Sequence, residues 1–277
     1  MAVAFKTEEG KKEIFKYYEL LLTKGTLNHE EIFVNTSYGE TFVIAMGKKE
    51  LPPLVLLHGS GMNSAMWRQE MELYAKKYRV YAVDMPGEPG KSDENQLPFE
   101  GDDFSNWLND VFNALSIEKA SIVGISLGAW LGTKFAIKYS EKVNKLVLLC
   151  PAGIGPQKKS FIFKFLFYSL VGEKGIDKLY YKINGDKLIP EIILNYQKLI
   201  VKHFNFRKVT IPLFSDDELR KLTMQVTLFV GGKDIMLHSK KTAKRLESLL
   251  KHVKINFIPE EGHSIINQGD KIRQFLN

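Results

Sequence analysis

The sequence predicts an α/β fold, with a mostly parallel, doubly wound sheet and an inserted helical cap. The first observation behind this prediction is that short apolar runs alternate with helical patterns between residues 54 and 150. Such alternation is typical of parallel strands joined by crossover helices. The second is that this rhythm stops after residues 152–156 and resumes at Val226, which indicates a segment inserted between two parts of one sheet. Ligands of such sheets bind at the carboxyl ends of the strands.

The chain is expected to begin with a helix and a hairpin. Apolar side chains recur at helical spacing within residues 8–22, so we predict an amphipathic helix that packs on the cap or on a partner. Residues 31–35 and 41–46 are predicted to be two strands, because a turn that contains Gly39 joins them.

Six further strands and five helices are predicted to build the rest of the core. The strands are short apolar runs of the kind that buried sheets contain: residues 54–57, 80–83, 120–125, 145–150, 226–230 and 254–258. The helices are expected at residues 65–76, 102–115, 127–139, 240–250 and 265–275. These elements divide the chain into an N-terminal helical extension, a core in two parts and a helical cap: residues 1–29, residues 30–151 with 223–277, and residues 152–222.

The composition is that of a globular protein. With 277 residues, of which 44% are hydrophobic, the chain can bury a large core, and no apolar run is long enough to cross a bilayer. The N-terminus becomes charged too early for a secretory signal, and a single cysteine excludes an intramolecular disulfide, so we expect a cytoplasmic protein. Cys150 ends an apolar run and is interpreted as a buried hydrophobic residue rather than a nucleophile. The net charge of +7 comes with scattered lysines and no recognition motif, so no nucleic-acid partner is expected.

The most informative segment is Gly124-Ile125-Ser126-Leu127-Gly128, which ends an apolar, β-branched run. A strand that ends in so tight a turn holds Ser126 in a strained conformation, and the two glycines let the following helix pack closely. The hydroxyl is then presented at a helix N-terminus, where backbone N–H groups stabilise a developing oxyanion. The segment predicts a nucleophile, although small residues also cluster in ordinary turns.

A serine nucleophile needs an imidazole that takes its proton and a carboxylate that orients the imidazole. Asp234 follows the predicted strand at residues 226–230, and His263 follows the strand at residues 254–258. Taken alone, Asp234 is better explained as a helix cap and His263 as a surface loop residue. The chain order Ser, Asp, His at three strand ends instead favours a catalytic triad of Ser126, Asp234 and His263.

Another glycine turn, His58-Gly59-Ser60-Gly61, directly follows the first parallel strand. A turn at this position supplies one donor to an oxyanion hole. We therefore expect the backbone N–H of Ser60 to be one donor and that of Leu127 to be the second. The alternative is a glycine turn shaped for packing alone. His58 itself is interpreted as a structural hydrogen-bonding residue.

Residues 84–92 end in Gly-Lys-Ser, as a phosphate-binding loop does. The spacing of that motif fails, because Met85 stands where its first glycine is required. We interpret the segment as a tight loop after a strand. Asp84 is expected to be a structural hydrogen-bonding residue rather than a metal ligand.

Together these motifs resemble the α/β-hydrolase superfamily from about Leu51 to the C-terminus. Within it, residues 66–67, 78–84 and 106–111 resemble bacterial carboxylesterases of the naproxen-esterase type. The resemblance implies an α/β-hydrolase fold with a cap and a serine hydrolase that cleaves carboxylic esters through an acyl-enzyme. No metal or other cofactor is expected.

Two features depart from the simplest form of this resemblance. The superfamily's usual Asp-x-Pro-Gly-x-Gly-x-Ser has one extra residue here, Glu88 or Pro89, which leaves the shape of that loop open. Residues 151–156 resemble the C–C bond hydrolases of aromatic degradation, which share the same triad. Those relatives usually carry an aromatic residue after the catalytic histidine, where this chain has Ser264.

The side chains of the predicted cap and of the predicted pocket indicate which kind of substrate fits. Residues 158–168 interleave aromatic side chains with lysines, which fits either a membrane-surface segment or an apolar roof over the cleft. We expect the roof and no stable membrane association. Met62, Trp67 and Trp130 are expected to add walls to the substrate pocket, which indicates an ester with a hydrophobic acyl or aryl part. Core packing explains these three side chains almost as well.

The sequence is compatible with three functions. The favoured one is a serine hydrolase with a small-molecule ester as its partner, as a monomer or a homodimer. The second keeps the triad but cleaves a C–C bond in vinylogous diketones. The third is a non-enzymatic ligand receptor that retains the triad.

Overall fold

The structure is a computed structural model that describes residues 4–24, 28–265 and 268–277. Within these residues the strands form one eight-stranded sheet in the order β1-β2-β4-β3-β5-β6-β7-β8. The strands are β1 (Glu30–Thr36), β2 (Gly39–Met46), β3 (Pro53–Leu57), β4 (Arg79–Val83), β5 (Ala120–Ile125), β6 (Val143–Leu149), β7 (Gln225–Gly231) and β8 (Val253–Ile258). The predicted α/β fold with a mostly parallel sheet is confirmed.

The direction of each strand follows from its connection. β1 and β2 pair antiparallel through a short turn in which Gly39 takes a positive φ of 109°. β2 also pairs antiparallel with β4, whereas all pairs from β4 to β8 are parallel. Every residue of the central strand β5 is buried, as expected for a strand covered on both faces. The carboxyl ends of the parallel strands therefore meet at one edge of the sheet.

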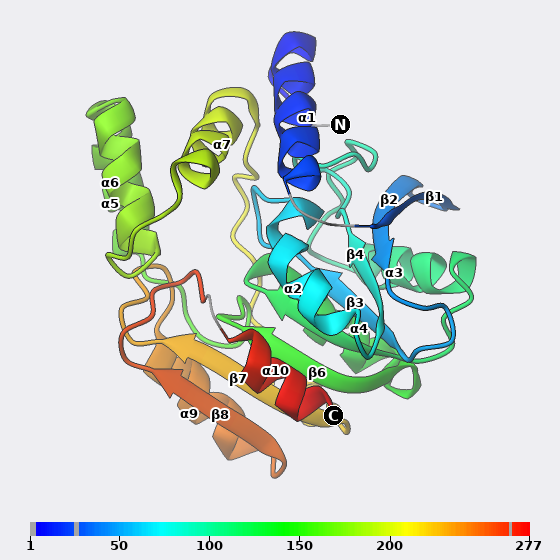
Figure 1. The fold of residues 1–277 in the computed structure, drawn as a ribbon. Coiled ribbons are helices and arrows are strands. Elements are labelled where there is room, and N and C mark those ends of the chain that lie inside the picture. The colour runs from blue at the N-terminus through cyan, green and yellow to red at the C-terminus, as the bar shows by residue number, and fades with distance from the viewer. Residues whose placement is uncertain (1–3, 25–27, 266–267) are drawn as a thin grey trace.

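Helices cover both faces of the sheet (Figure 1). On one face lie α2 (Arg68–Tyr74) and α10 (Gly269–Leu276), and on the other lie α3 (Asp103–Ala114), α4 (Leu127–Lys138) and α9 (Ser239–Leu249). Each face has its own hydrophobic cluster, one containing Trp107 and Phe135 and the other containing Tyr74 and Phe229. This layered packing holds the strand ends, and so the loops that follow them, in fixed positions.

Two predicted helices differ from the observed ones. The expected helix at residues 65–76 is a 3₁₀ turn, η1 (Ser64–Trp67), followed by α2, which ends at Tyr74. The Asn63 side chain caps η1 by accepting the N–H of Ala65 at 3.2 Å. The expected helix at residues 265–275 begins only at Gly269. Residues 266–267, which belonged to that expectation, lie outside the described residues.

Four helices lie between β6 and β7: α5 (Ser160–Leu170), α6 (Glu173–Ile183), α7 (Glu191–His203) and α8 (Asp216–Arg220). Figure 1 shows α5, α6 and α7 standing apart from the sheet, on the same side as α1 (Glu8–Thr23). The N-terminal helix packs on α7, since the rings of Tyr17 and Tyr196 stack with centroids 5.2 Å apart. The Tyr17 hydroxyl also donates to the Ile192 carbonyl oxygen at 2.8 Å.

The helical period divides the aromatic side chains of α5 between two sides. Phe161 and Phe165 are half-buried, with ring centroids 6.5 Å apart. Phe163 and Phe167 keep 72% and 62% of their surface exposed. The aromatic residues of this segment therefore do not share one face. In the part of the chain that the structure describes, no helix combines the length and the apolar character needed to span a membrane.

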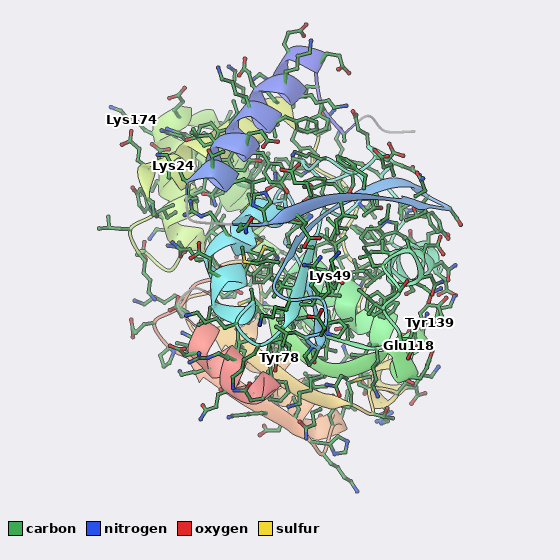
Figure 2. All side chains as sticks on the ribbon, turned by 45° about the vertical axis from the view of Figure 1, so that its right-hand side comes forward. Lys24, Lys49, Tyr78, Glu118, Tyr139 and Lys174 are labelled. Atoms are coloured by element: carbon green, nitrogen blue, oxygen red, sulfur yellow. The ribbon has the colours of Figure 1, made fainter. Side chains whose placement is uncertain are left out.

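Figure 2 shows the two ends of the molecule. Tyr78 and Glu118, which precede β4 and β5, lie at the end away from Lys174, which belongs to helix α6. The amino ends of the parallel strands are therefore remote from the inserted helices. The loops at the carboxyl ends face them.

Candidate active site

Ser126 lies in a strained turn between β5 and α4. Its backbone has φ 53° and ψ −109°, a left-handed region that side chains with a Cβ rarely adopt. The glycines on either side make this turn possible. A Cβ added to Gly124 would lie 2.4 Å from the Gly128 oxygen, and one added to Gly128 would lie 2.2 Å from the Leu57 oxygen. Helix α4 can therefore begin directly against the backbone of β3.

Three side chains from separate strand ends meet in one hydrogen-bonded chain. His263 Nε2 lies 3.0 Å from Ser126 Oγ, and His263 Nδ1 lies 2.8 Å from Asp234 Oδ2. Because the carboxylate only accepts, Nδ1 carries the ring proton and Nε2 is free to accept the serine proton. The parallel neighbours β5, β6, β7 and β8 bring these distant residues together at one edge of the sheet.

The carboxylate in this chain is buried but fully partnered. Asp234 is 2% exposed, and its second oxygen accepts the backbone N–H groups of Met236 at 2.7 Å and Leu237 at 2.9 Å. Burial by itself raises the pKa of Asp234. The nearby His263, through its charge and its hydrogen bond, and the two N–H donors outweigh burial and hold that pKa below its usual value. Asp234 is therefore ionised and able to orient the imidazole.

Cys150 lies beside this chain, and ligand atoms of Cys150, Asp234 and His263 lie within 4.8 Å of one another. Burial, together with the nearby Asp234 carboxylate, raises the pKa of the Cys150 thiol well above its usual value. A protonated thiol is a poor metal ligand, and the other two groups are already paired with each other. The donor set fits a hydrogen-bonded pair beside a packed thiol better than it fits a metal centre. The prediction that Cys150 is buried is confirmed.

The two backbone N–H groups expected to form the oxyanion hole belong to Leu127 and Ser60. Leu127 is the first residue of α4, so its N–H has no acceptor within the helix. The turn after β3, residues 58–63, runs alongside Ser126, since a Cβ added to Gly59 would lie 3.8 Å from the Ser126 Cβ. We call these residues the β3 turn. Ser60, which was expected to supply the second donor, lies in it and is exposed.

The start of the β3 turn is held by His58. Its Nε2 accepts the N–H of Met85 at 2.9 Å, and its Nδ1 donates to the Gly59 oxygen at 2.9 Å. Burial lowers the pKa of His58, opposed by the nearby Asp84 and by the Gly59 hydrogen bond, and a neutral ring is what these two bonds require. His58 thus joins the strand ends of β3 and β4, in agreement with the structural role expected for it.

Asp84 also serves as an internal acceptor. One of its oxygens accepts the Ser64 N–H at 2.8 Å, and the other accepts the Lys91 N–H at 2.8 Å. The Tyr18 hydroxyl of helix α1 donates to both oxygens, at 3.1 and 3.2 Å. These contacts agree with the expectation that Asp84 is a structural residue. They join the N-terminal helix to the loop after β4.

The inserted segment contacts both the aspartate and the histidine loops, which sequence reasoning missed. Lys158 Nζ donates to the Asp234 carbonyl oxygen at 2.6 Å, and the His263 N–H donates to the Ile183 oxygen at 2.7 Å. A Cβ added to Gly262 would lie 2.3 Å from that same Ile183 oxygen. No local pattern signals these contacts, because each joins residues that are far apart in the sequence.

The three side chains expected to line the substrate pocket lie in different surroundings. Trp130 is fully buried, and its ring packs against Phe214 with centroids 6.0 Å apart. Trp67 is 3% exposed and belongs to the hydrophobic cluster on the opposite face of the sheet. Met62, in the β3 turn, is half-buried. Of the three, Met62 is the one with surface left for a ligand.

Comparisons with known proteins agree with this fold. Residues 52–171 match the α/β hydrolase fold family. Over 99% of its length the chain is 26% identical to carboxylesterase YbfK of Bacillus subtilis, covering 95% of that protein. The crystal structure of naproxen esterase from the same organism superposes with a TM-score of 0.86 at 26% identity, covering 98% of this chain and 100% of that one. A 2-hydroxy-6-oxo-6-(2'-aminophenyl)hexa-2,4-dienoic acid hydrolase of Metapseudomonas resinovorans is 28% identical over 88% of each chain.

Proposed function

We propose that this chain, a member of the α/β-hydrolase superfamily, hydrolyses carboxylic esters with Ser126 as nucleophile, His263 as general base and Asp234 as the residue that orients the base. The observation that carries the proposal is the unbroken hydrogen-bonded chain from Ser126 Oγ through His263 to the buried Asp234. The similarity to the carboxylesterases YbfK and naproxen esterase, which extends over nearly the whole length of each chain, supports an ester as the substrate.

The first half-reaction forms an acyl-enzyme. Ser126 Oγ attacks the ester carbonyl carbon while His263 Nε2 takes the hydroxyl proton, and the ester oxygen becomes a tetrahedral oxyanion. Collapse of this intermediate breaks the bond to the alcohol, which leaves with the proton that His263 returns. The Asp234 carboxylate stabilises the imidazolium that exists between these two events.

The second half-reaction reverses these roles with water. His263 takes a proton from a water molecule as that water attacks the acyl-enzyme carbonyl. The carboxylic acid product then departs, and Ser126 Oγ regains its proton. In both halves the Leu127 N–H and the Ser60 N–H are the donors proposed for the oxyanion. Each such donor contributes roughly 3 to 4 kcal/mol to transition-state stabilisation in a site of this kind.

Residues 152–222 are proposed to form the cap that limits access to Ser126. The contacts of Lys158 and Ile183 with the aspartate and histidine loops support this role, because they place the inserted segment against two of the three reacting groups. We propose that Met62 borders the acyl or aryl part of the ester. Trp67 and Trp130 are packed in the core on opposite faces of the sheet, so they are not proposed to line the pocket.

The test compares two serines of the same strand and its turn. Ser126→Ala is expected to lower kcat for a short-chain aryl ester by about 10⁴-fold or more, with an unchanged circular dichroism melting temperature. Ser121→Ala is the matched control, because Ser121 is a buried serine near the other end of β5. Its kcat is expected to equal that of the wild type. A fluorophosphonate probe is expected to label the wild type and Ser121→Ala but not Ser126→Ala.

Two outcomes would overturn the proposal. If the wild type turns over a vinylogous diketone much faster than any aryl ester, the triad serves C–C bond cleavage, as the name of the Metapseudomonas relative states for that protein. If the wild type neither hydrolyses an ester panel nor reacts with the probe, yet binds a small ligand tightly, the protein is a receptor.

A further inference from the structure

Glu88 is a buried carboxylate that the proposed reaction does not use. Glu88 lies in the loop after β4, where either it or Pro89 is the extra residue, and it is only 2% exposed. Its Oε2 accepts the backbone N–H of Gly61 at 2.7 Å, and its carboxylate also accepts a hydrogen bond from the Ser60 side chain. Glu88 therefore contacts the β3 turn at Ser60, which carries the proposed oxyanion donor, and at Gly61, which follows it.

One cation faces this carboxylate. Arg207 follows helix α7, and its Nε lies 3.4 Å from Glu88 Oε1. The other guanidinium nitrogens donate to the Leu97 oxygen at 2.5 Å and to the Pro86 oxygen at 3.4 Å. The guanidinium carbon also lies 5.1 Å from the centroid of the Phe99 ring. Arg207 is thus held by several groups at once, so it is a fixed partner for Glu88 rather than a mobile surface charge.

The same part of the inserted segment touches the β3 turn at two further points. A Cβ added to Gly61 would lie 2.4 Å from the Phe206 ring, so this ring packs directly on the turn. Asn63, at the end of the turn, hydrogen-bonds the Tyr196 hydroxyl of helix α7. The turn is therefore enclosed by Glu88 on one side and by residues 196–207 on the other.

We propose that Glu88 is a positioning residue for the oxyanion hole, and that Arg207 links its carboxylate to the cap. By accepting the Gly61 N–H and the Ser60 hydroxyl, Glu88 holds the Ser60–Gly61 peptide and the Ser60 side chain, and so restricts the backbone rotation that orients the Ser60 N–H. Glu88 touches no reacting atom in this scheme and acts only through the β3 turn. The inference rests on the proposed ester hydrolysis, because an oxyanion hole has a role only if an oxyanion forms.

Burial moves the pKa of the Glu88 carboxyl into the neutral pH range. Burial raises the pKa of Glu88 to about 7, although Arg207, the Gly61 N–H and the Ser60 side chain all act to lower it. Among the described residues, Arg207 is the one charged side chain paired with Glu88. His58 and Asp84, at the strand ends beneath the loop, are bonded to other groups. Above pH 7 the ionised form accepts from both donors, and below it the protonated form is a weaker acceptor.

The first test is Glu88→Gln. Glutamine has the same shape but a single acceptor oxygen, so its NH₂ group must face either the Gly61 N–H or Arg207. We expect kcat for an aryl ester to fall about tenfold or more, with KM changed less than about twofold, because the β3 turn shifts while ground-state binding is retained. The control is Glu30→Gln, which removes the Glu30–Arg79 ion pair of 2.8 Å. Arg79 begins β4, at the end of the sheet remote from the cap, so kcat is expected to stay unchanged.

A second readout does not depend on turnover. Hydrogen–deuterium exchange of peptides covering residues 58–63 is expected to become faster in Glu88→Gln, under conditions in which circular dichroism shows both proteins to be folded. Glu30→Gln is expected to leave this exchange unchanged. If exchange does not change in Glu88→Gln, or if it changes while kcat stays at the wild-type value, the proposal is overturned.

The pH profile separates positioning by the charge from simple packing. The ratio of wild-type to Glu88→Gln kcat cancels every effect of pH that the two proteins share. We expect this ratio to rise with pH through about 7. In Arg207→Met the corresponding step moves to higher pH, since Arg207 lowers the pKa of Glu88, and Arg207→Lys keeps the step closer to the wild-type position. A ratio independent of pH contradicts the proposal.

The design also distinguishes this inference from the proposed function. If Ser126→Ala retains the wild-type rate, ester hydrolysis by Ser126 is wrong, and the positioning role falls with it. If Ser126→Ala is inactive and Glu88→Gln is fully active, only the inference about Glu88 is wrong.

Discussion

The backbone N–H of His263 donates to the carbonyl oxygen of Ile183, the last residue of helix α6, with nitrogen and oxygen 2.7 Å apart. The histidine loop is thereby attached to the inserted segment. Gly262, the residue before the histidine, makes this approach possible, because a Cβ there would lie 2.3 Å from both the Ile183 oxygen and the Gly185 nitrogen. The position of the proposed general base depends on this contact.

Gly262→Ala is therefore expected to impair activity more than stability alone explains. The added methyl group must separate the end of α6 from the histidine loop, which costs about 1 to 3 kcal/mol of unfolding free energy and lowers kcat at least tenfold. The measurements are chemical denaturation and aryl-ester turnover. Gly101→Ala is the control, since its φ of 71° makes the substitution strained but no atom lies within 4 Å of the added Cβ. Equal kcat in the two variants would contradict the prediction.

The two glycines of helix α4 provide a matched pair for the turn at Ser126. Gly128→Ala places a Cβ 2.2 Å from the rigid backbone oxygen of Leu57, so it is expected to destabilise the fold by about 2 to 3 kcal/mol. At Gly132→Ala, one turn later, the three nearest atoms all belong to side chains, the closest being that of Ile122 at 3.2 Å, and the substitution gains helix propensity. Its stability is expected to be equal to or above that of the wild type. Urea denaturation checks both, and similar losses in both would exclude this explanation of the glycine motif.

Asp234→Asn tests the role of the carboxylate. The amide group facing His263 Nδ1 forces the ring proton onto Nε2, which then no longer accepts the Ser126 proton. We expect kcat to fall by about 10⁴-fold, with the fold retained. The control is Asp217→Asn, because Asp217 is a highly exposed surface aspartate paired with Arg220. Retention of more than a tenth of the wild-type kcat in Asp234→Asn would exclude the proposed orientation of the base.

A comparison of variants at Lys158 and Lys159 tests whether activity depends on one hydrogen bond or on the positive charge of the segment. Lys158 donates to the Asp234 oxygen, whereas its neighbour Lys159 is exposed. Lys158→Met is expected to reduce kcat several-fold, because the aspartate loop loses a charge-assisted hydrogen bond worth about 1.5 to 3 kcal/mol. Lys159→Met is expected to leave kcat unchanged. If both variants lose activity equally, the effect comes from the positive charge of the segment rather than from this contact.

The burial of Glu88 is also expected to change how the free energy of unfolding depends on pH. Its folded-state pKa of about 7 lies above the ordinary value of 4.5, so the folded protein binds more protons than the unfolded chain between these pH values. The free energy of unfolding of the wild type relative to Glu88→Gln is therefore expected to decrease as pH rises from 4.5 to 7, by about 3 kcal/mol at most. Above pH 7 the difference stays constant. The free energy of unfolding of the wild type relative to Glu30→Gln is not expected to decrease in this range, because the carboxylate lost in that variant has a lowered pKa.

The local signals of the proposed site were visible in the sequence because each rests on short-range geometry. Ser126 needs a tight turn and so has glycines two residues away on both sides, while Asp234 and His263 follow apolar runs that form strands. Two helix starts differ from the prediction. Asn63 caps a 3₁₀ turn ahead of α2, whereas α10 begins at Gly269 without a side-chain cap.

The supporting contacts had no comparable signal. Glu88 and Arg207 are 119 residues apart, and Lys158 and Asp234 are 76 residues apart. In the sequence, Glu88 is one of two candidates for an extra loop residue, and Lys158 is one basic residue among aromatic ones. The partners of Glu88 and Lys158 are determined by the packing of the inserted segment on the strand ends.

Residue order and periodicity alone were enough for the parallel sheet, the turn at Ser126 and the identity of the three residues proposed to react, because strand alternation and turn geometry depend on neighbours within a few positions. The tertiary structure decided how the inserted segment holds the loops around those residues. It also decided that Trp67 and Trp130 belong to the core. These features depend on which distant surfaces meet and exclude water. That choice is made by the packing of the whole chain and not by any one segment of it.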